Sequence, residues 1–196
     1  MRDIQDASTG RISGARSESR TGHCVPVKKT QITLKLQESI RMSRIKELQK
    51  QVHIVLEKIE ENDKRAKAAA HLHGVSLAAV MIAKKRGEDP ELAAMAGLLH
   101  DLYAYKSGNY DDHAHRGGAE YAGKLLGKMK LTTPEETDVI CSAIWHHGDK
   151  DTVDAPMDEV LKDADVIHHS LADPMKEVKE QERERYIRLC KEFGMH

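Results

Sequence analysis

Apolar residues recur at steps of three and four along the chain from about residue 42, and this periodicity constrains the fold more than any other feature. Ile45, Leu48, Val52, Val55 and Ile59 form one such stripe, which predicts a helix over about residues 42 to 60. No segment alternates like a half-buried strand. Aromatic residues make up only 4% of the chain, so aliphatic side chains between helices must supply the core. The expected fold class is all-α, a compact bundle of about six to seven helices with no significant sheet.

Residues that favour helix ends divide the chain further. Asn62 or Asp63 suits an N-cap and Gly87 a C-terminal stop, which predicts a helix that ends at Arg86. Asp89-Pro90 reads as a cap followed by a first-turn proline, so it begins the next helix. Further starts are predicted at Thr133-Pro134, where Glu136 completes a capping box, at Pro156, and at Pro174 for a last helix over 174 to 193.

The first 30 or so residues differ from the rest, because they are rich in Arg, Ser, Thr and Gly and contain few large apolar side chains. We expect a disordered tail over 1–41 and a single helical domain over 42–196. Alternatively, Met42 is the true start and the preceding residues are an over-extended gene prediction. The intact mass of the natively expressed protein distinguishes the two.

Charge and cysteine content limit the classes of partner. Lys and Arg number 31 against 32 Asp and Glu, so no bulk charge favours nucleic acid or a membrane surface. The three cysteines form no CxxC pair, which is typical of a reducing cytoplasm. No stretch approaches the roughly 18 apolar residues of a membrane span. We therefore expect a cytoplasmic protein with no membrane or nucleic-acid partner, and regard the helices at 42–60 and 174–193 as surfaces for a homodimer.

The pair His100-Asp101 closes an apolar run and follows His71 by 29 residues. Neighbouring side chains on a helix point about 100° apart, so both reach one metal ion only if other helices supply further ligands. His71 and Asp165 are the candidates, with His73 and Asp163 as rivals. Imidazole nitrogen together with carboxylate oxygen suits a divalent transition metal such as Mn, Fe, Co, Ni or Zn.

These pieces occur in a recognisable order. His71 lies in His71-Leu-His-Gly-Val75, His100-Asp101 ends Gly97-Leu-Leu-His-Asp101, and Asp165 ends Leu161-Lys-Asp-Ala-Asp165. Residues 62–173 thereby resemble the HD-domain superfamily of metal-dependent phosphohydrolases, whose motif order is His, His-Asp, Asp. The resemblance implies an HD-type helical domain and favours His71 over His73, while the Ala-Asp dipeptide after an apolar half-helix favours Asp165 over Asp163.

The resemblance also bears on whether the site binds one metal ion or two. Some HD-domain proteins bind two ions, with the Asp of the His-Asp pair as a bridge and two further histidines on the second ion. Here those extra ligands would be His113 or His115, and His146 or His147. The expected cofactor is one or two divalent ions. His168, His169 and His196 are interpreted as helix-end or surface residues.

The function that the resemblance implies is hydrolysis of a phosphate ester, in a nucleotide or another small phosphorylated metabolite, by metal-activated water. Asp101 would also orient that water or take its proton. Lys106, Arg116 and Lys162 are the cations nearest the ligands in sequence, and Lys106 and Arg116 are the candidates for holding substrate phosphate, although each also suits a plain surface charge.

Two other functions remain open. The same ligands resemble those of mixed-valent di-iron oxygenases built on this scaffold. Iron in the purified protein together with oxygen uptake would indicate this function. Alternatively, the chain is a non-enzymatic helical interaction module. In that case His100→Ala would abolish folding or partner binding, and the wild-type protein would have no enzymatic activity.

Overall fold

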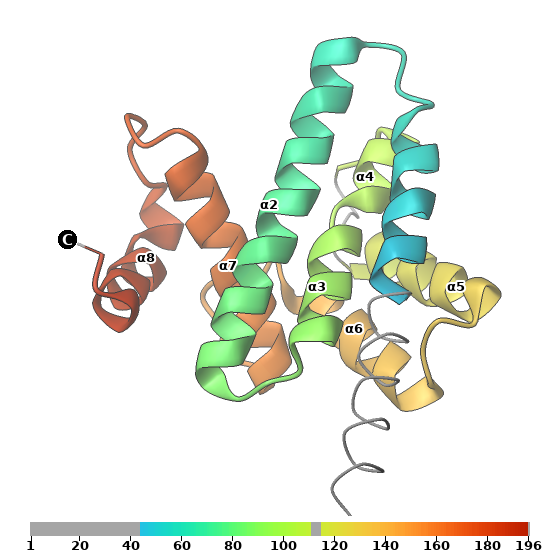
Figure 1. Ribbon diagram of the computed structural model, residues 1–196. Helices are drawn as coiled ribbons and strands as arrows, with labels where there is room; N and C mark the ends of the chain where they lie inside the picture. The colour runs from blue at the N-terminus through green and yellow to red at the C-terminus, as the bar shows by residue number, and fades with distance from the viewer. Residues whose placement is uncertain (1–43, 111–114, 196) are drawn as a thin grey trace, which may run out of the picture. The chain divides into compact units, whose positions relative to one another are not determined.

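The computed structural model describes residues 44–110 and 115–195, except for the side chains at positions 115 and 116. Helices make up most of these residues and no strand occurs among them, which confirms the all-α class (Figure 1). A helix over 44–56 is followed by α2 (Asn62–Arg86), α3 (Pro90–Leu99), α4 (Leu102–Ser107), the π-helix η1 (His115–Ala119), α5 (Glu120–Met129), α6 (Pro134–His146), α7 (Pro156–Ala172) and α8 (Glu180–Phe193). The predicted tail at 1–41, Met42, His113 and His196 lie outside the described residues.

Several helix ends are where the capping residues placed them. Asp89 accepts hydrogen bonds from the backbone N–H groups of Glu91 and Leu92, at 2.8 and 3.3 Å, at the start of α3. Thr133 and Glu136 form the predicted capping box of α6. Gly87 ends α2 with φ of 81°, a left-handed conformation that favours glycine. These boundaries were predictable because each depends on residues a few positions apart.

Other boundaries need correction. The first helix ends at residue 56 rather than 60, where backbone bonds from Lys58 to Val55 and from Ile59 to Leu56 tighten the chain before it reverses. Glu61, rather than Asn62 or Asp63, is the N-cap of α2. Pro174 does not open a helix. It lies in a turn that a 3.0 Å bond from Lys176 N–H to the Asp173 carbonyl closes, because the fixed φ of proline suits a turn as well as a first helical position.

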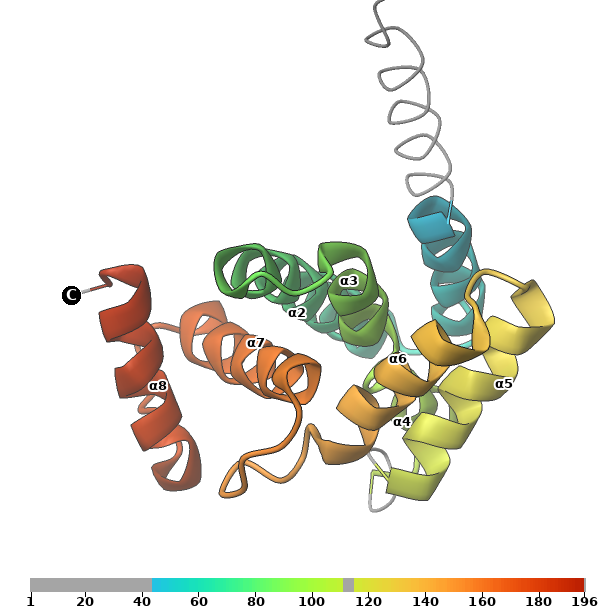
Figure 2. The same cartoon turned by 90° about the horizontal axis from the view of Figure 1, so that it is seen from below.

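Helices α2, α3 and α7 form the centre of the core, with α6 against α3 and α7. Both views show α3 and α7 alongside α2 (Figures 1 and 2). A Cβ at Gly97 would lie 2.6 Å from the Cα of Ser76, so only glycine lets α3 approach α2 this closely. At the same crossing, Ser76 Oγ donates a 2.9 Å hydrogen bond to the Ala94 carbonyl. The C-terminal end of α3 is thereby held against the middle of α2.

Helix α2 is long and apolar enough to cross a membrane, by length and composition alone. The expectation that no stretch reaches this length is therefore wrong for α2. In the most apolar window of the helix 44% of the residues are buried, and its buried face packs on α3 and α7. Packing within the bundle accounts for the composition of this helix.

Candidate metal centre

Histidine and aspartate side chains from several helices meet beside the crossing of α2 and α3. His71, on α2, has its Nε2 2.9 Å from Nε2 of His100, which directly follows α3. The same His71 atom lies 3.2 Å from Oδ2 of Asp101. His100 is fully buried, whereas the Asp101 side chain is 19% exposed. The structure thus brings His71 and the His-Asp pair to one site that opens on the Asp101 side.

Asp165 joins this cluster from α7. Its Oδ1 lies 3.7 Å from His71 Nε2 and 3.8 Å from His100 Nε2. That oxygen is buried and accepts no hydrogen bond from the part of the chain that the structure describes. The other oxygen, Oδ2, accepts a 2.8 Å hydrogen bond from Nζ of Lys150, a nearly buried lysine. One oxygen of Asp165 is therefore neutralised, while the other faces the histidines.

The two neighbouring histidines at the end of α6 point in different directions. His147 is buried, and its Nε2 lies 3.5 Å from Oδ1 of Asp101. His146 instead places Nδ1 2.9 Å from Oδ2 of Asp158 on α7. Of this pair, only His147 lies in the cluster.

Helix ends fix the orientation of His100 and His147. The last carbonyls of a helix have no partner within it. The His100 ring satisfies one at the end of α3, with Nδ1 2.8 Å from the Gly97 oxygen, and the His147 ring satisfies one at the end of α6, with Nδ1 2.7 Å from the Ile144 oxygen. A carbonyl only accepts hydrogen bonds, so Nδ1 carries the proton in both rings, and Nε2 of a neutral ring offers a lone pair to the cluster.

Burial and charge set the protonation states. Burial lowers the pKa of His100 to about 3, so this imidazole is neutral. Burial alone would raise the pKa of Asp101, and positive charge on His100, His147 and His71 would lower it far below its usual value. Neutral imidazoles do not supply that charge, and a bound cation would take their place in keeping Asp101 ionised. Burial opposes ionisation of Asp165 as well, and there Lys150 and the nearby histidines bring the pKa well below normal. The site therefore combines neutral imidazole with carboxylate.

A second layer of histidines supports His71. Nδ1 of His168, on α7, lies 3.1 Å from Nδ1 of His71. A Cβ at Gly74 would lie 2.2 Å from Cδ2 of His168, so His168 occupies the space that a larger residue would fill. His169 comes close on the other side, with Nε2 3.5 Å from Oδ1 of Asp165. The Glu182 carboxylate raises the pKa of His169, whereas burial lowers the pKa of His168.

The donor set suits a divalent transition metal. Two ligand atoms at about 2.1 Å from one ion in tetrahedral geometry lie roughly 3.4 Å apart. The separations from His71 Nε2 to the two carboxylates, 3.2 and 3.7 Å, bracket this value. Lone pairs that face carboxylates repel unless a cation or a proton lies between them. Neutral imidazoles whose second nitrogen is bound to backbone are characteristic of metal ligands.

The other candidates make contacts of their own, are exposed, or are not described. His73 is exposed, and Lys106 is exposed with Nζ 4.5 Å from the centre of the Tyr121 ring. Asp163 pairs with Arg86 and Arg185, at 2.7 and 2.9 Å. Lys162 is buried among oxygens of Thr152, Asp154 and Glu159. His113 lies outside the described residues, and the side chains of His115 and Arg116 are not described, so their roles stay predictions.

Sequence reasoning missed Lys150, and it interpreted His168 and His169 as helix-end or surface residues. Lys150 lies in the connection between α6 and α7 and shares no motif with Asp165. His169 had one usable signal, because it follows Asp165 by one helical turn and so shares its face. His168 had none, since its contact with His71 depends on how α7 packs against α2.

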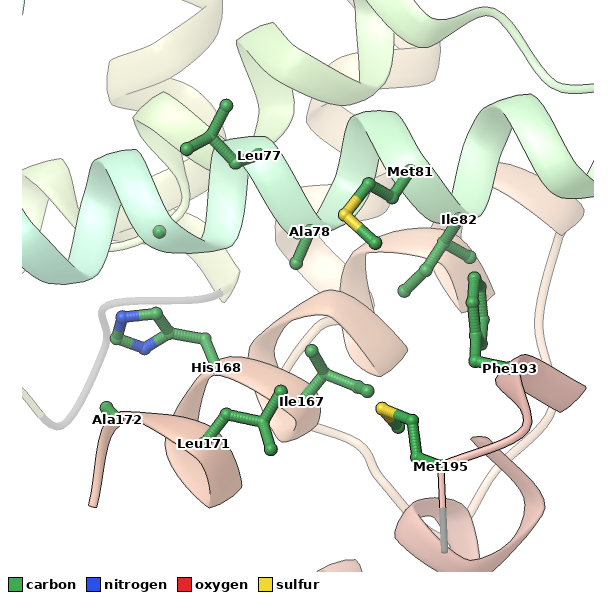
Figure 3. A pocket seen from close by; sticks show the side chains of 11 residues that line it. Leu77, Ala78, Met81, Ile82, Ile167, His168, Leu171, Ala172, Phe193 and Met195 are labelled. Atoms are coloured by element: carbon green, nitrogen blue, oxygen red, sulfur yellow. The ribbon is translucent and has the colours of Figure 1, made fainter. Parts of the chain in front are cut away.

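An apolar pocket of about 470 Å³ adjoins the cluster between α2, α7 and the C-terminal end of α8. Figure 3 shows Met81, Ile167, Leu171, Phe193 and Met195 around it, with His168 at one end. Because the His168 ring also contacts His71, this ring connects the pocket wall to the cluster.

Comparison with known proteins identifies one family. The model of the HD domain matches residues 68–170, just over half of the chain. Ribonuclease Y of Alkaliphilus metalliredigens (strain QYMF) is 41% identical over 80 residues, which are 40% of this chain and 15% of that protein. The chain thus spans only a small part of that curated relative. No solved structure matches the chain.

Proposed function

Because the chain belongs to the HD-domain family of metal-dependent phosphohydrolases, we propose that it hydrolyses a phosphate ester with one or two divalent transition-metal ions held by the cluster. The substrate would be a nucleotide or another small phosphorylated metabolite. The observation that carries this proposal is the convergence of histidine Nε2 atoms on two carboxylates, one buried and one partly exposed. His71 and His100 contribute their Nε2 atoms, with Asp101 and Asp165 opposite.

The residues of the cluster would have different roles in metal binding and in orienting the water. His71, His100, Asp101 and Asp165 would hold the ion, with His147 beside Asp101 as a further ligand. A bound divalent ion would lower the pKa of its water towards about 7 and would neutralise charge on a phosphoryl oxygen. Asp101, which the bound ion would keep ionised, is suited to orient the water by accepting a hydrogen bond rather than to store its proton.

Lys150 supplies a positive charge that the family motif does not include. Its Nζ holds Asp165 Oδ2 at 2.8 Å, which leaves Oδ1 directed at the histidines. A nearly buried ammonium group beside the cluster also favours an anionic substrate. Lys106 and Arg116 stay as predicted phosphate contacts.

The curated relative is a ribonuclease by name, so RNA belongs among the substrates to be tested. RNA is a phosphodiester, and the same metal chemistry would act on it. The near balance of 31 basic and 32 acidic residues favours a small substrate over a polyanion. We therefore propose a mononucleotide or small phosphoester first.

The test compares wild type with the double variant His100→Ala/Asp101→Ala, both purified anaerobically. Metal content is measured first, followed by phosphate release from nucleotides, sugar phosphates and short RNA with Mn²⁺, Co²⁺ or Ni²⁺. The control is His53→Ala, because His53 is exposed on the first helix and pairs with Glu57.

We expect wild type and His53→Ala to hold one or two ions per chain and to release phosphate, and the double variant to do neither. Wild type that is metal-free and inert while fully folded contradicts the proposal and supports an interaction module. Iron-loaded protein that consumes oxygen without releasing phosphate supports the oxygenase.

A further inference from the structure

Besides the pair His100-Asp101, the cluster contains a second pair of Asp and His, and both of its residues lie on α7. His169 follows Asp165 by one turn of α7, and its Nε2 lies 3.5 Å from Oδ1 of Asp165. Its ring stacks on that of His71, with centroids 5.3 Å apart and planes 12° from parallel. Donor atoms of His71, Asp165 and His169 all lie within 4.8 Å of one another. The 3.5 Å separation is close to the roughly 3.4 Å between two ligands of one tetrahedral ion.

The second nitrogen of His169 faces a buried carboxylate. Nδ1 lies 3.4 Å from Oε1 of Glu182 on α8, an ion-pair separation without the geometry of a hydrogen bond, and Glu182 is only 2% exposed. Lys179, at the start of α8, lies 3.0 Å from the same oxygen. A carboxylate next to the second ring nitrogen of a histidine is a common arrangement around metal ligands, because it directs the other nitrogen at the ion. His100 and His147 have backbone carbonyls in this position.

Burial places His169 at the open edge of the cluster. Its side chain is 35% exposed, against 0% for His100. The Oδ1 atom of Asp165 between them is buried and has no hydrogen-bond donor among the described residues, although an ionised oxygen in that environment needs a proton or a cation. A ligand at this edge would contact the ion from the α7 side of the cluster.

We propose that His169 is a further metal ligand, which binds the ion through Nε2 with Glu182 as its orienting carboxylate. The inference rests on the proposed metal-dependent function. It adds a second ligand from α7 to the four residues of the family motif. Through Glu182, it also links metal binding to the packing of α8 against α7.

The experiment titrates Co²⁺ into the full chain after treatment with a chelator, and records the affinity and the visible absorption of bound Co²⁺. His169→Asn is the main variant, because its amide nitrogen occupies the place of Nδ1 while nothing replaces Nε2. His169→Gln is the second variant, because its amide oxygen replaces Nε2. His53→Ala is the control, since His53 and Glu57 form an exposed pair with the same spacing of four residues.

We expect His169→Asn to weaken Co²⁺ binding at least about tenfold and to change the absorption bands, with His169→Gln less affected and His53→Ala unchanged. Circular dichroism of the metal-free variants verifies folding. Wild-type affinity and spectrum in a folded His169→Asn variant would overturn the inference, and phosphate release by that variant would leave the proposed function intact. Failure of wild type to bind Co²⁺ would reject both.

Discussion

Nδ1 of His168 lies 3.1 Å from Nδ1 of His71, and the ring of His168 fills the space beside the bare Cα of Gly74. If His71 binds an ion through Nε2, its Nδ1 carries a proton and donates to His168. His168 then acts as a positioning residue that fixes the tautomer and the direction of the His71 ring. Such outer partners are worth about 10–100-fold in metal affinity.

Gly74→Ala tests this relationship without altering a ligand. The new Cβ would lie 2.2 Å from the His168 ring, so that ring must shift, which disturbs its 3.1 Å contact with His71. We expect Co²⁺ affinity to fall by about tenfold or more while the helical content stays the same. Gly127→Ala is the matched control, because a Cβ at that helical position meets no atom within 4 Å. Equal Co²⁺ affinities in the two variants would show that the His71–His168 contact does not matter for binding.

The adjacent pair His146 and His147 provides a second test. His147 points at Asp101, whereas His146 pairs with Asp158. We expect His147→Ala to lower metal affinity or the number of ions bound, and His146→Ala to retain wild-type metal binding. Elemental analysis and Co²⁺ titration of both variants provide the measurement. The reverse pattern would mean that the end of α6 rotates when the ion binds.

Arg185 holds the connection that carries Lys150. This buried guanidinium contacts Glu159 at 2.7 Å and Asp163 at 2.9 Å, and it donates to the Lys150 carbonyl at 2.8 Å. Arg185→Ala removes this partner from buried Asp163 and half-buried Glu159, which keep Arg86 and Lys162 respectively, so we expect a loss of about 1–3 kcal/mol in the free energy of unfolding.

Urea unfolding of the metal-free chain measures this loss. Arg183→Ala is the control, because Arg183 is 51% exposed and forms a surface pair with Glu180. That substitution should change the free energy of unfolding by less than about 0.5 kcal/mol. Similar losses for the two arginines would contradict a special role for Arg185.

The buried imidazole of His100 makes stability depend on pH in the metal-free protein. Its pKa is about 3 in the folded state, below the usual value of 6.5. Between these values the unfolded chain binds a proton that the folded chain does not, so this contribution to stability is present above pH 6.5 and is lost as the pH falls towards 3. The slope is at most about 1.4 kcal/mol per pH unit.

Urea unfolding at pH 7 and pH 5, in the presence of a chelator, checks this. The comparison variant is His100→Asn, whose amide nitrogen can still donate to the Gly97 carbonyl but does not titrate. We expect wild type to lose more stability than the variant over this interval. Taking the difference between the two removes the effect of His169, whose raised pKa acts in the opposite sense. Equal slopes would mean that His100 is accessible to protons when folded.

The amino-acid sequence by itself determined the all-α class and many helix ends. Asp89 and Thr133 cap helices through atoms two or three residues away, and Gly87 ends a helix through its own φ. Such interactions are local, so they can be predicted from the sequence alone. The order of His71, His100-Asp101 and Asp165 indicated the family for a similar reason, since motif order is a property of the chain.

Tertiary packing decided the rest. The choice of His147 over His146 depends on the direction in which each ring leaves the end of α6. Lys150 meets Asp165 only because the connection after α6 folds back over α7, and His168 meets His71 only where Gly74 leaves room. Contacts between residues distant in sequence depend on helix orientation and on the space between backbones, which periodicity and capping residues do not encode.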